Sequence, residues 1–238
     1  MCPKALIIGA TSGIGKALAK ELLHHHYHVG IIGRRAKKLE KIKLLSPQNI
    51  FSLACDITQE KALPKLEKLI SEMGGMDLLV LSAGVGFENK NLDYGPENAT
   101  NQLNVVAFTK VMCWGMNFFI AQGHGHLANI SSVAMHRGNK VAPAYSASKA
   151  YQSNYLEGLS QKVHQLKLPI TITDIRPGFV KTAMAKAKNQ FWVSSKEKAA
   201  KQIFSALKKK RSVTYISRRW VIIGKLLALL PKGVYKRM

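Results

Sequence analysis

A short apolar segment, residues 4–8, runs directly into Gly9-Ala10-Thr11-Ser12-Gly13-Ile14-Gly15, and a helical pattern follows over residues 16–24. Glycines between a strand and a helix let the backbone pass close to a pyrophosphate, and the helix N-terminus supplies free N–H groups and a positive dipole. The turn therefore predicts a dinucleotide site with contacts from Gly9, Thr11, Ser12, Gly13, Ile14 and Gly15. A plain tight turn without a ligand is the alternative.

The same alternation of short apolar runs and longer helical patterns continues along the chain. Nearly continuous apolar runs bounded by Gly or Asp suit parallel strands that are buried on both faces. The predicted strands are 4–8, 28–32, 50–54, 78–81, 126–130, 170–175 and 213–216, and the longer helical patterns include 61–73, 101–121, 146–166 and 196–207. This order predicts an α/β fold: a Rossmann-type, doubly wound parallel sheet of about seven strands with helices on both faces.

Length and composition suit one main domain. A chain of 238 residues with 47% hydrophobic content can bury a single large core. We expect a nucleotide-binding and catalytic domain over 1–217, followed by a basic amphipathic tail over 218–238.

The end of the second predicted strand bears on the choice of cofactor. It reads Ile31-Ile32-Gly33-Arg34-Arg35, without the acidic residue that would hold a ribose 2′-hydroxyl. Guanidinium groups bind phosphate in bidentate fashion, whereas a carboxylate would repel it. Arg34 and Arg35 therefore favour NADP(H) over NAD(H). A solvated pair of side chains that opens the next helix is the alternative.

A second group of residues predicts a site for proton transfer. Tyr145 and Lys149 are four residues apart in a predicted helix and so share one face. A neighbouring ammonium favours the phenolate, and we expect it to lower the pKa of Tyr145 from about 10, which would make a general acid or base near neutral pH. Ser132 follows the strand predicted over 126–130, and strand ends in open α/β sheets are where ligands bind.

Taken together, these segments resemble those of the short-chain dehydrogenase/reductase family, in its compact single-domain branch. The resemblance covers most of the chain, in the family's order. It rests on the glycine turn, Asp56 in Cys55-Asp56-Ile57-Thr58, Asn104, Asn129-Ile130-Ser131-Ser132, Tyr145-Ser146-Ala147-Ser148-Lys149 and Arg176-Pro177-Gly178-Phe179-Val180-Lys181-Thr182. The chain departs from the family at Leu81-Ser82-Ala83-Gly84, where the usual segment is Asn-Asn-Ala-Gly; this departure puts the local hydrogen bonding in doubt.

The resemblance implies roles for four catalytic residues. Tyr145 would exchange a proton with the carbonyl or alcohol oxygen, and Ser132 would hydrogen-bond the same oxygen. Lys149 would tune Tyr145 and bind the ribose hydroxyls, and Asn104 would hold a water in a proton relay from Lys149. The further cofactor contacts that it implies are Asp56, Ile57, Ser82, Ala83, Gly84, Tyr145, Lys149, Pro177, Gly178, Val180 and Thr182.

The implied function is that of an NADP-dependent oxidoreductase, a carbonyl reductase or alcohol dehydrogenase that moves hydride between NADPH and an apolar ketone or aldehyde. The resemblance also implies a homo-oligomer, a dimer or tetramer that pairs through the helices over 101–121 and 146–166. The alternative is a catalytically idle regulatory or interaction protein of the same fold that senses a dinucleotide.

The charge of the chain is strongly positive. Lys and Arg total 36 against 13 acidic residues, a formal net charge of +23, which favours contact with polyanions. A generally basic source proteome is the alternative. The basic residues are scattered and no nucleic-acid motif accompanies them, so we expect no specific nucleic-acid partner.

The tail contains an apolar stretch over 220–230 with basic residues on both sides. It is shorter than the ~20 residues that span a bilayer. A helix in the interface of an anionic membrane fits it; packing on a partner subunit or over the substrate pocket are the alternatives. Residues 183–193, with Met184, Phe191 and Trp192, would be the substrate lid in this family; an ordinary surface loop is the alternative.

Cysteine and histidine usage favours a reducing compartment without metal chemistry. Cys2, Cys55 and Cys113 form no CxxC pair and no secretory leader is recognisable, so we expect a cytoplasmic protein, peripheral on the inner membrane face if the tail binds lipid. The histidines over 24–28 fall where the first helix should end, and a polar helix terminus explains them better than a metal site.

Overall fold

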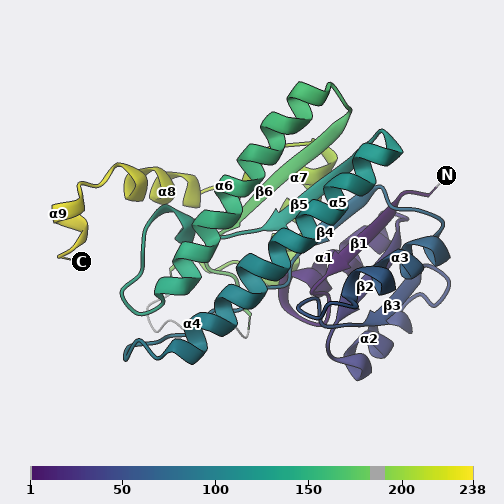
Figure 1. Cartoon of the computed structure of the whole chain (residues 1–238), viewed down its shortest axis with the longest axis horizontal. Coiled ribbons are helices and arrows are strands. Elements are labelled where there is room, and N and C mark those ends of the chain that lie inside the picture. Colours follow the sequence, from purple (N-terminus) through teal and green to yellow (C-terminus); the bar gives the residue numbers. More distant parts are fainter. Residues whose placement is uncertain (1, 183–190, 238) are drawn as a thin grey trace.

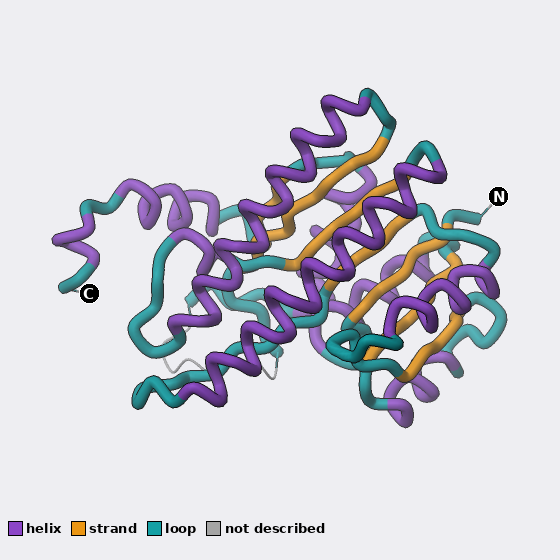
Figure 2. The backbone as a smooth tube through the Cα atoms, viewed as in Figure 1, coloured by secondary structure: helices purple, strands orange, loops and turns teal. Residues whose placement is uncertain are grey.

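The computed structural model describes residues 2–182 and 191–237, which form one seven-stranded parallel sheet. Its strand order is β3-β2-β1-β4-β5-β6-β7 (Figures 1 and 2). The strands are β1 (Lys4–Ile8), β2 (His28–Gly33), β3 (Ile50–Ala54), β4 (Leu78–Leu81), β5 (Gly125–Ile130), β6 (Ile170–Pro177) and β7 (Val213–Ile216). The prediction of a doubly wound sheet is confirmed.

The strand order reverses between β1 and β4, because β1 pairs with β2 on one side and with β4 on the other. Open sheets of this kind bind ligands in the crevice beyond the carboxyl ends of the strands at such a reversal. The glycine turn follows β1 directly, and Ser82-Ala83-Gly84 directly follows Leu81, the last residue of β4. Both segments therefore lie at this crevice.

Helices cover both faces of the sheet (Figure 1). One core cluster joins the sheet to α1 (Gly13–His24), α2 (Ala36–Lys43) and α7 (Lys196–Lys208). The other joins it to α3 (Ala62–Met73), α5 (Phe108–Gln122) and α6 (Pro143–Leu166). Burial on both faces explains why Leu6, Ile7 and Ile8 are all fully inaccessible and why the strands read as unbroken apolar runs.

The helix that ends in α5 begins earlier than the sequence suggests. It starts with α4 (Tyr94–Asn101), passes through a π-helical segment, η1 (Gln102–Ala107), and continues as α5. Within the described residues, Tyr94–Gln122 is the one helix whose length and hydropathy would allow it to cross a membrane. Phe108 and Phe119 of this helix are fully buried in the second core cluster, which is the packing of a core helix.

The tail forms α8 (Trp220–Leu229) and a short α9 (Lys232–Tyr235), which extend to one side of the sheet (Figure 1). Trp220, the first residue of α8, is 4% exposed. Arg137 follows the 3-10 helix η2 (Val133–His136) and donates to the carbonyl oxygens of Leu227 at 2.6 Å, Ala228 at 3.0 Å and Leu230. These bonds satisfy carbonyl groups that the end of a helix leaves unpaired.

Candidate active site

The glycine turn is built from close backbone approaches. Gly9 has φ +98°, and a Cβ on it would lie 2.5 Å from the backbone nitrogen of Ala83. A Cβ on Gly15 would lie 2.4 Å from the carbonyl oxygen of Gly9. Only glycine fits at these two positions. The helix α1 starts just after Ser12, whose side chain makes no capping bond, so its first N–H groups face the turn.

Two arginines lie beside this turn. Arg35 donates from Nε to Thr11 Oγ1 at 3.0 Å and from Nη2 to Ser12 Oγ at 2.8 Å. Arg34 places Nη1 3.6 Å from Asp56 Oδ2 and is largely exposed. The structure thus gathers two cations, two hydroxyls and a helix N-terminus in one place, which is chemistry that fits a phosphate-bearing dinucleotide.

Asp56 remains ionised at this edge. Burial acts to raise its pKa, but hydrogen bonds from the Thr58 backbone and hydroxyl, and the charge of Arg34, outweigh it and lower the pKa. The neighbouring Ile57 is buried in the second core cluster. Its side chain therefore anchors the loop, and its backbone is the part left for a ligand.

Two further predicted cofactor residues, Ser82 and Thr182, lie against the glycine turn. Ser82 Oγ would lie 3.0 Å from a Cβ on Gly15, and Thr182 Cγ2 would lie 3.5 Å from a Cβ on Gly13. Val180 is buried in the first core cluster, and Ile14 packs against that cluster.

Lys149 is the buried centre of the proton chemistry. Its Nζ donates to the carbonyl oxygen of Ile130 at 3.0 Å and to Gln152 Oε1 at 2.9 Å. It lies 5.7 Å from the centroid of the Tyr145 ring. A Cβ on Gly84 would come within 3.4 Å of both Lys149 Nζ and Asn104 Oδ1. Three segments of the chain therefore meet at this amine.

Burial dominates the protonation of Lys149. It lowers the pKa of the amine to about 8, while the negative charge of Asp174 acts in the opposite direction. A lysine whose pKa is close to neutral can change its protonation state under ordinary conditions.

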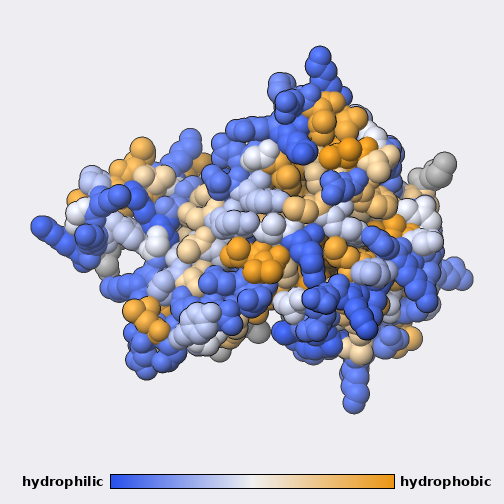
Figure 3. Space-filling view, viewed as in Figure 1, coloured by the Kyte–Doolittle hydropathy of each residue, from blue (hydrophilic) through white to orange (hydrophobic). Residues whose placement is uncertain are grey.

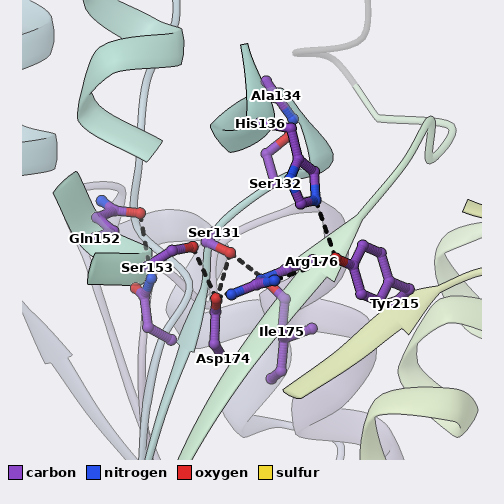
Figure 4. Close-up of polar contacts among 11 residues, drawn as sticks. Ser131, Ser132, Ala134, His136, Gln152, Ser153, Asp174, Ile175, Arg176 and Tyr215 are labelled. Atoms are coloured by element: carbon purple, nitrogen blue, oxygen red, sulfur yellow. Dashed lines mark hydrogen bonds and ion pairs between the residues drawn. The ribbon is translucent and has the colours of Figure 1, made fainter. Parts of the chain in front are cut away.

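Tyr145 hydrogen-bonds the Ser132 side chain. Ser132 Oγ also accepts from the Ala134 backbone N–H at 3.1 Å (Figure 4). Burial raises the pKa of Tyr145, and the bond to Ser132 offsets this only in part. The expectation that Lys149 lowers the pKa is wrong for the described chain. The amine donates to Ile130 and Gln152, and burial of the phenol is the largest cause of its raised pKa.

Both polar atoms of the Asn104 side chain are hydrogen-bonded. Its Nδ2 donates to the carbonyl oxygen of Val85 at 2.7 Å and to Ser148 Oγ at 3.0 Å, and its Oδ1 accepts from the Val85 N–H at 3.0 Å. These bonds fix the loop after β4 against α6.

A buried polar cluster behind the site was missed from the sequence. Asp174 on β6 is 3% exposed and accepts from Ser131 Oγ, from Ser153 Oγ at 2.7 Å and from Arg176 Nε at 2.6 Å. Figure 4 shows these side chains converging on the carboxylate. A carboxylate within a buried apolar strand was the available signal, because a buried charge has to be paired.

The cluster continues outward from Arg176. Its Nη1 donates to Tyr215 OH at 3.1 Å, and Tyr215 OH lies 3.0 Å from His136 Nε2 (Figure 4). Gly224 of α8 lies against these two rings: a Cβ there would come within 2.8 Å of His136 Nε2. Among the described residues, no three His, Cys, Asp or Glu side chains are grouped in a way that could hold a metal ion.

The fold, with its glycine turn at the β1–β4 reversal, defines a Rossmann-type α/β protein. The sequence profile described as short chain dehydrogenase matches residues 3–192. An uncharacterized oxidoreductase of Myxococcus xanthus (strain DK1622) is 32% identical over 191 residues, 78% of this chain and 75% of that protein. Another from Staphylococcus aureus (strain MW2) is 30% identical over 189 residues, with 78% and 81% covered.

Solved structures agree in fold. ElxO with NADP bound has a TM-score of 0.79 at 23% identity, over 91% of this chain and 97% of that one. A short chain dehydrogenase from Burkholderia cenocepacia J2315 in complex with NADP has a TM-score of 0.82 at 19% identity, over 99% and 97%. The chain belongs to the short-chain dehydrogenase family and is an oxidoreductase.

Proposed function

We propose that the protein is an NADP-dependent carbonyl reductase, which catalyses the reverse alcohol oxidation when concentrations favour it. The observation that carries this proposal is the meeting of Tyr145, Ser132 and Lys149 at the end of β5, beside the turn that Arg35 covers. Retention of all three residues in one cluster speaks against the idle regulatory alternative.

NADPH, when bound, supplies a hydride to the carbonyl carbon. Tyr145 gives its proton to the carbonyl oxygen, so that an alcohol is formed, and its raised pKa keeps that proton available until the transfer. Ser132 hydrogen-bonds the same oxygen and stabilises the charge that develops there. The glycine turn, Arg34, Arg35, Asp56, Ser82–Gly84, Pro177, Gly178, Val180 and Thr182 would hold the cofactor, and Lys149 its ribose hydroxyls.

Cofactor preference supplies the direct test. We expect wild-type protein to bind NADPH more tightly than NADH, and Arg34→Asp to lower the ratio of the two affinities by roughly 10- to 100-fold, since hydrogen bonds to a charged group contribute about 1.5–3 kcal/mol. Titration of the purified protein, followed by the fluorescence of the reduced cofactor, measures both affinities.

Arg211→Asp is the matched control, because Arg211 is exposed and precedes β7, at the opposite edge of the sheet. The assignment of the 2′-phosphate to Arg34 fails if the two variants keep the same ratio. If neither cofactor binds the wild-type protein, the idle alternative becomes the better description.

An aromatic cluster supports an apolar substrate. Phe191 stacks on Trp220 with ring centroids 5.1 Å apart, and Phe179 meets Trp220 edge-on at 5.3 Å. A Cβ on Gly178 would come within 2.1 Å of the Trp220 ring, so this ring lies on the Pro177-Gly178 segment. Trp192 completes the cluster at 6.2 Å from Trp220. Met184, also expected there, lies outside the described residues.

The tail supports a peripheral membrane contact. Ile222, Leu226 and Leu229 are 60%, 57% and 81% exposed, and their spacing places them on one face of α8. The flanking basic side chains are Arg218, Arg219, Lys232, Lys236 and Arg237. Figure 3 shows hydrophobic atoms exposed over α8 beside hydrophilic ones. This pattern fits a helix that lies in the interface of an anionic membrane.

Vesicle flotation tests the tail. We expect the wild-type chain to bind vesicles containing phosphatidylglycerol, and a chain with Ile222, Leu226 and Leu229 all changed to Ser to lose most of this binding, because the apolar face is removed while every charge remains. Changing Leu44 and Leu45, two exposed leucines after α2, to Ser provides the control. Equal vesicle binding by all three proteins would mean that the general surface charge, and not the apolar face of α8, causes the binding.

Assembly and location follow from the same proposal. We propose a homodimer or homotetramer that pairs through α5 and α6. Tyr151 of α6 is 38% exposed, and Val106, which lies in η1 just before α5, is 55% exposed. We place the protein in the cytoplasm, with residues 218–238 as the part that meets the inner membrane face and 1–217 as the catalytic domain.

A further inference from the structure

Gln152 is a buried amide whose two ends are both bonded within the active site. It lies one helical turn after Lys149 on α6 and is 1% exposed. Its Oε1 accepts from Lys149 Nζ at 2.9 Å and from Asn129 Nδ2 at 3.2 Å. Its Nε2 donates to the backbone carbonyl oxygen of Asn104 at 2.8 Å.

The partners determine which way this amide points. An ammonium can only donate and a carbonyl oxygen can only accept, so the oxygen of Gln152 has to face Lys149 and its nitrogen has to face Asn104. The reversed amide would lose both bonds. Figure 4 shows the Gln152 side chain from α6 beside Ser153 and close to the Asp174 cluster.

We propose that Gln152 is a positioning residue of this active site, which holds the Lys149 amine in one place by bridging it to the backbone of Asn104. The resemblance to the family assigns this bridge between Asn104 and Lys149 to a bound water. Here a side chain of the protein itself makes the connection. An amide fixes the distance between its two partners, whereas a mobile water does not.

The bridge also bears on the charge of Lys149. Ile130 and Gln152 are the two acceptors that the structure gives this buried ammonium, and an acceptor stabilises the charged form. Two titratable groups face the amine among the described residues, Tyr145 on α6 and Asp174 on β6. The inference rests on the proposed function only for the catalytic role of Lys149.

The titration of Lys149 tests the bridge without any turnover. In cofactor-free, full-length protein labelled with ¹³C at lysine Cε, NMR follows the Lys149 signal, which is assigned by its absence from Lys149→Met. We expect a wild-type midpoint at about pH 8. Gln152→Leu removes an acceptor and should lower the midpoint by about one pH unit, and Gln152→Glu supplies a negative acceptor and should raise it by about one unit.

Opposite shifts from two changes at one position are the signature of a hydrogen-bonding role. Gln122→Leu is the matched control: Gln122 ends α5 and bonds the carbonyl oxygen of Met76 at 3.1 Å, at the other end of the sheet. Unmoved midpoints, or shifts in the same direction, would overturn the proposal and leave Gln152 as a space-filling residue. If Gln152→Leu does not fold, Gln152→Met, which keeps the length of the side chain and removes its amide, takes its place and should lower the midpoint in the same way.

The same experiment separates this inference from the proposed function. If the protein reduces no carbonyl compound, the proposed reaction fails while the NMR midpoints still report on the bridge. If it does reduce one, the limb of the pH–rate profile that Lys149 controls should move in the direction of the NMR midpoint in each variant. A profile that stays unmoved while the midpoints shift would overturn the positioning role.

Discussion

Tyr145→Phe is expected to remove the proposed carbonyl reduction, with a fall in kcat of roughly 10²- to 10⁴-fold, the usual contribution of a positioned proton donor. NADPH affinity should stay nearly unchanged, because the phenyl ring keeps its place: a Cβ on Gly86 would lie 2.5 Å from Cδ2 of Tyr145, so the ring already fills this space. The substitution removes one hydroxyl, the group that hydrogen-bonds Ser132.

Tyr151→Phe on the same helix is the control for this prediction. The Tyr151 hydroxyl lies 2.8 Å from Thr109 Oγ1 and the side chain is 38% exposed, so loss of this hydroxyl should leave kcat unchanged. Steady-state kinetics and cofactor titration on both variants decide the matter. Parallel loss of activity and NADPH binding in Tyr145→Phe would contradict a proton-transfer role.

Asp174→Ala is expected to lower the free energy of unfolding by ~3–5 kcal/mol, the range for breaking one side of a buried ion pair. The change leaves the partly buried Arg176 guanidinium without its carboxylate. It also leaves Ser153 without its acceptor, and Ser131 Oγ with the Ile175 carbonyl oxygen as its remaining acceptor. It also removes the negative charge that favours the ammonium of Lys149. Urea unfolding followed by circular dichroism measures the loss.

Ser153→Ala is the reference against which the loss of stability in Asp174→Ala is compared. It removes one donor from the cluster and leaves the ion pair intact, so it should cost about 1 kcal/mol. If Asp174→Ala costs no more than Ser153→Ala, the carboxylate is not the centre of the cluster. Asp174→Asn, which keeps the shape and loses the charge, should fall between the two.

The strands were predictable because both faces of the sheet are covered. An apolar run such as Lys4–Ile8 has no other stable location in the fold, and β2, β5 and β6 differ from the prediction only in being longer by one or two residues. The glycine turn was predictable for a related reason, since the positions of Gly9 and Gly15 admit no side chain. Such local constraints can be recognised without knowing the rest of the structure.

The polar interior was not predictable in the same way. Gln152 and Asn104 are far apart in the sequence, and their bond exists only because α6 packs against η1. The predicted direction of the Tyr145 pKa shift is wrong because the sequence shows a neighbouring lysine but does not show that burial raises the pKa of the phenol. Both outcomes depend on tertiary packing, which cannot be inferred from the spacing of residues along one helix.

The bonds from Arg137 to the last carbonyl groups of α8 have a consequence for how the tail can be altered. Ser132, which caps η2, and Arg137 lie at the two ends of one six-residue segment, 132–137. Shortening the chain before Trp220 would leave Arg137 without these acceptors and would uncover the Pro177-Gly178 segment. A stop codon near residue 218 would therefore also alter the surroundings of a segment that we propose to contact the cofactor.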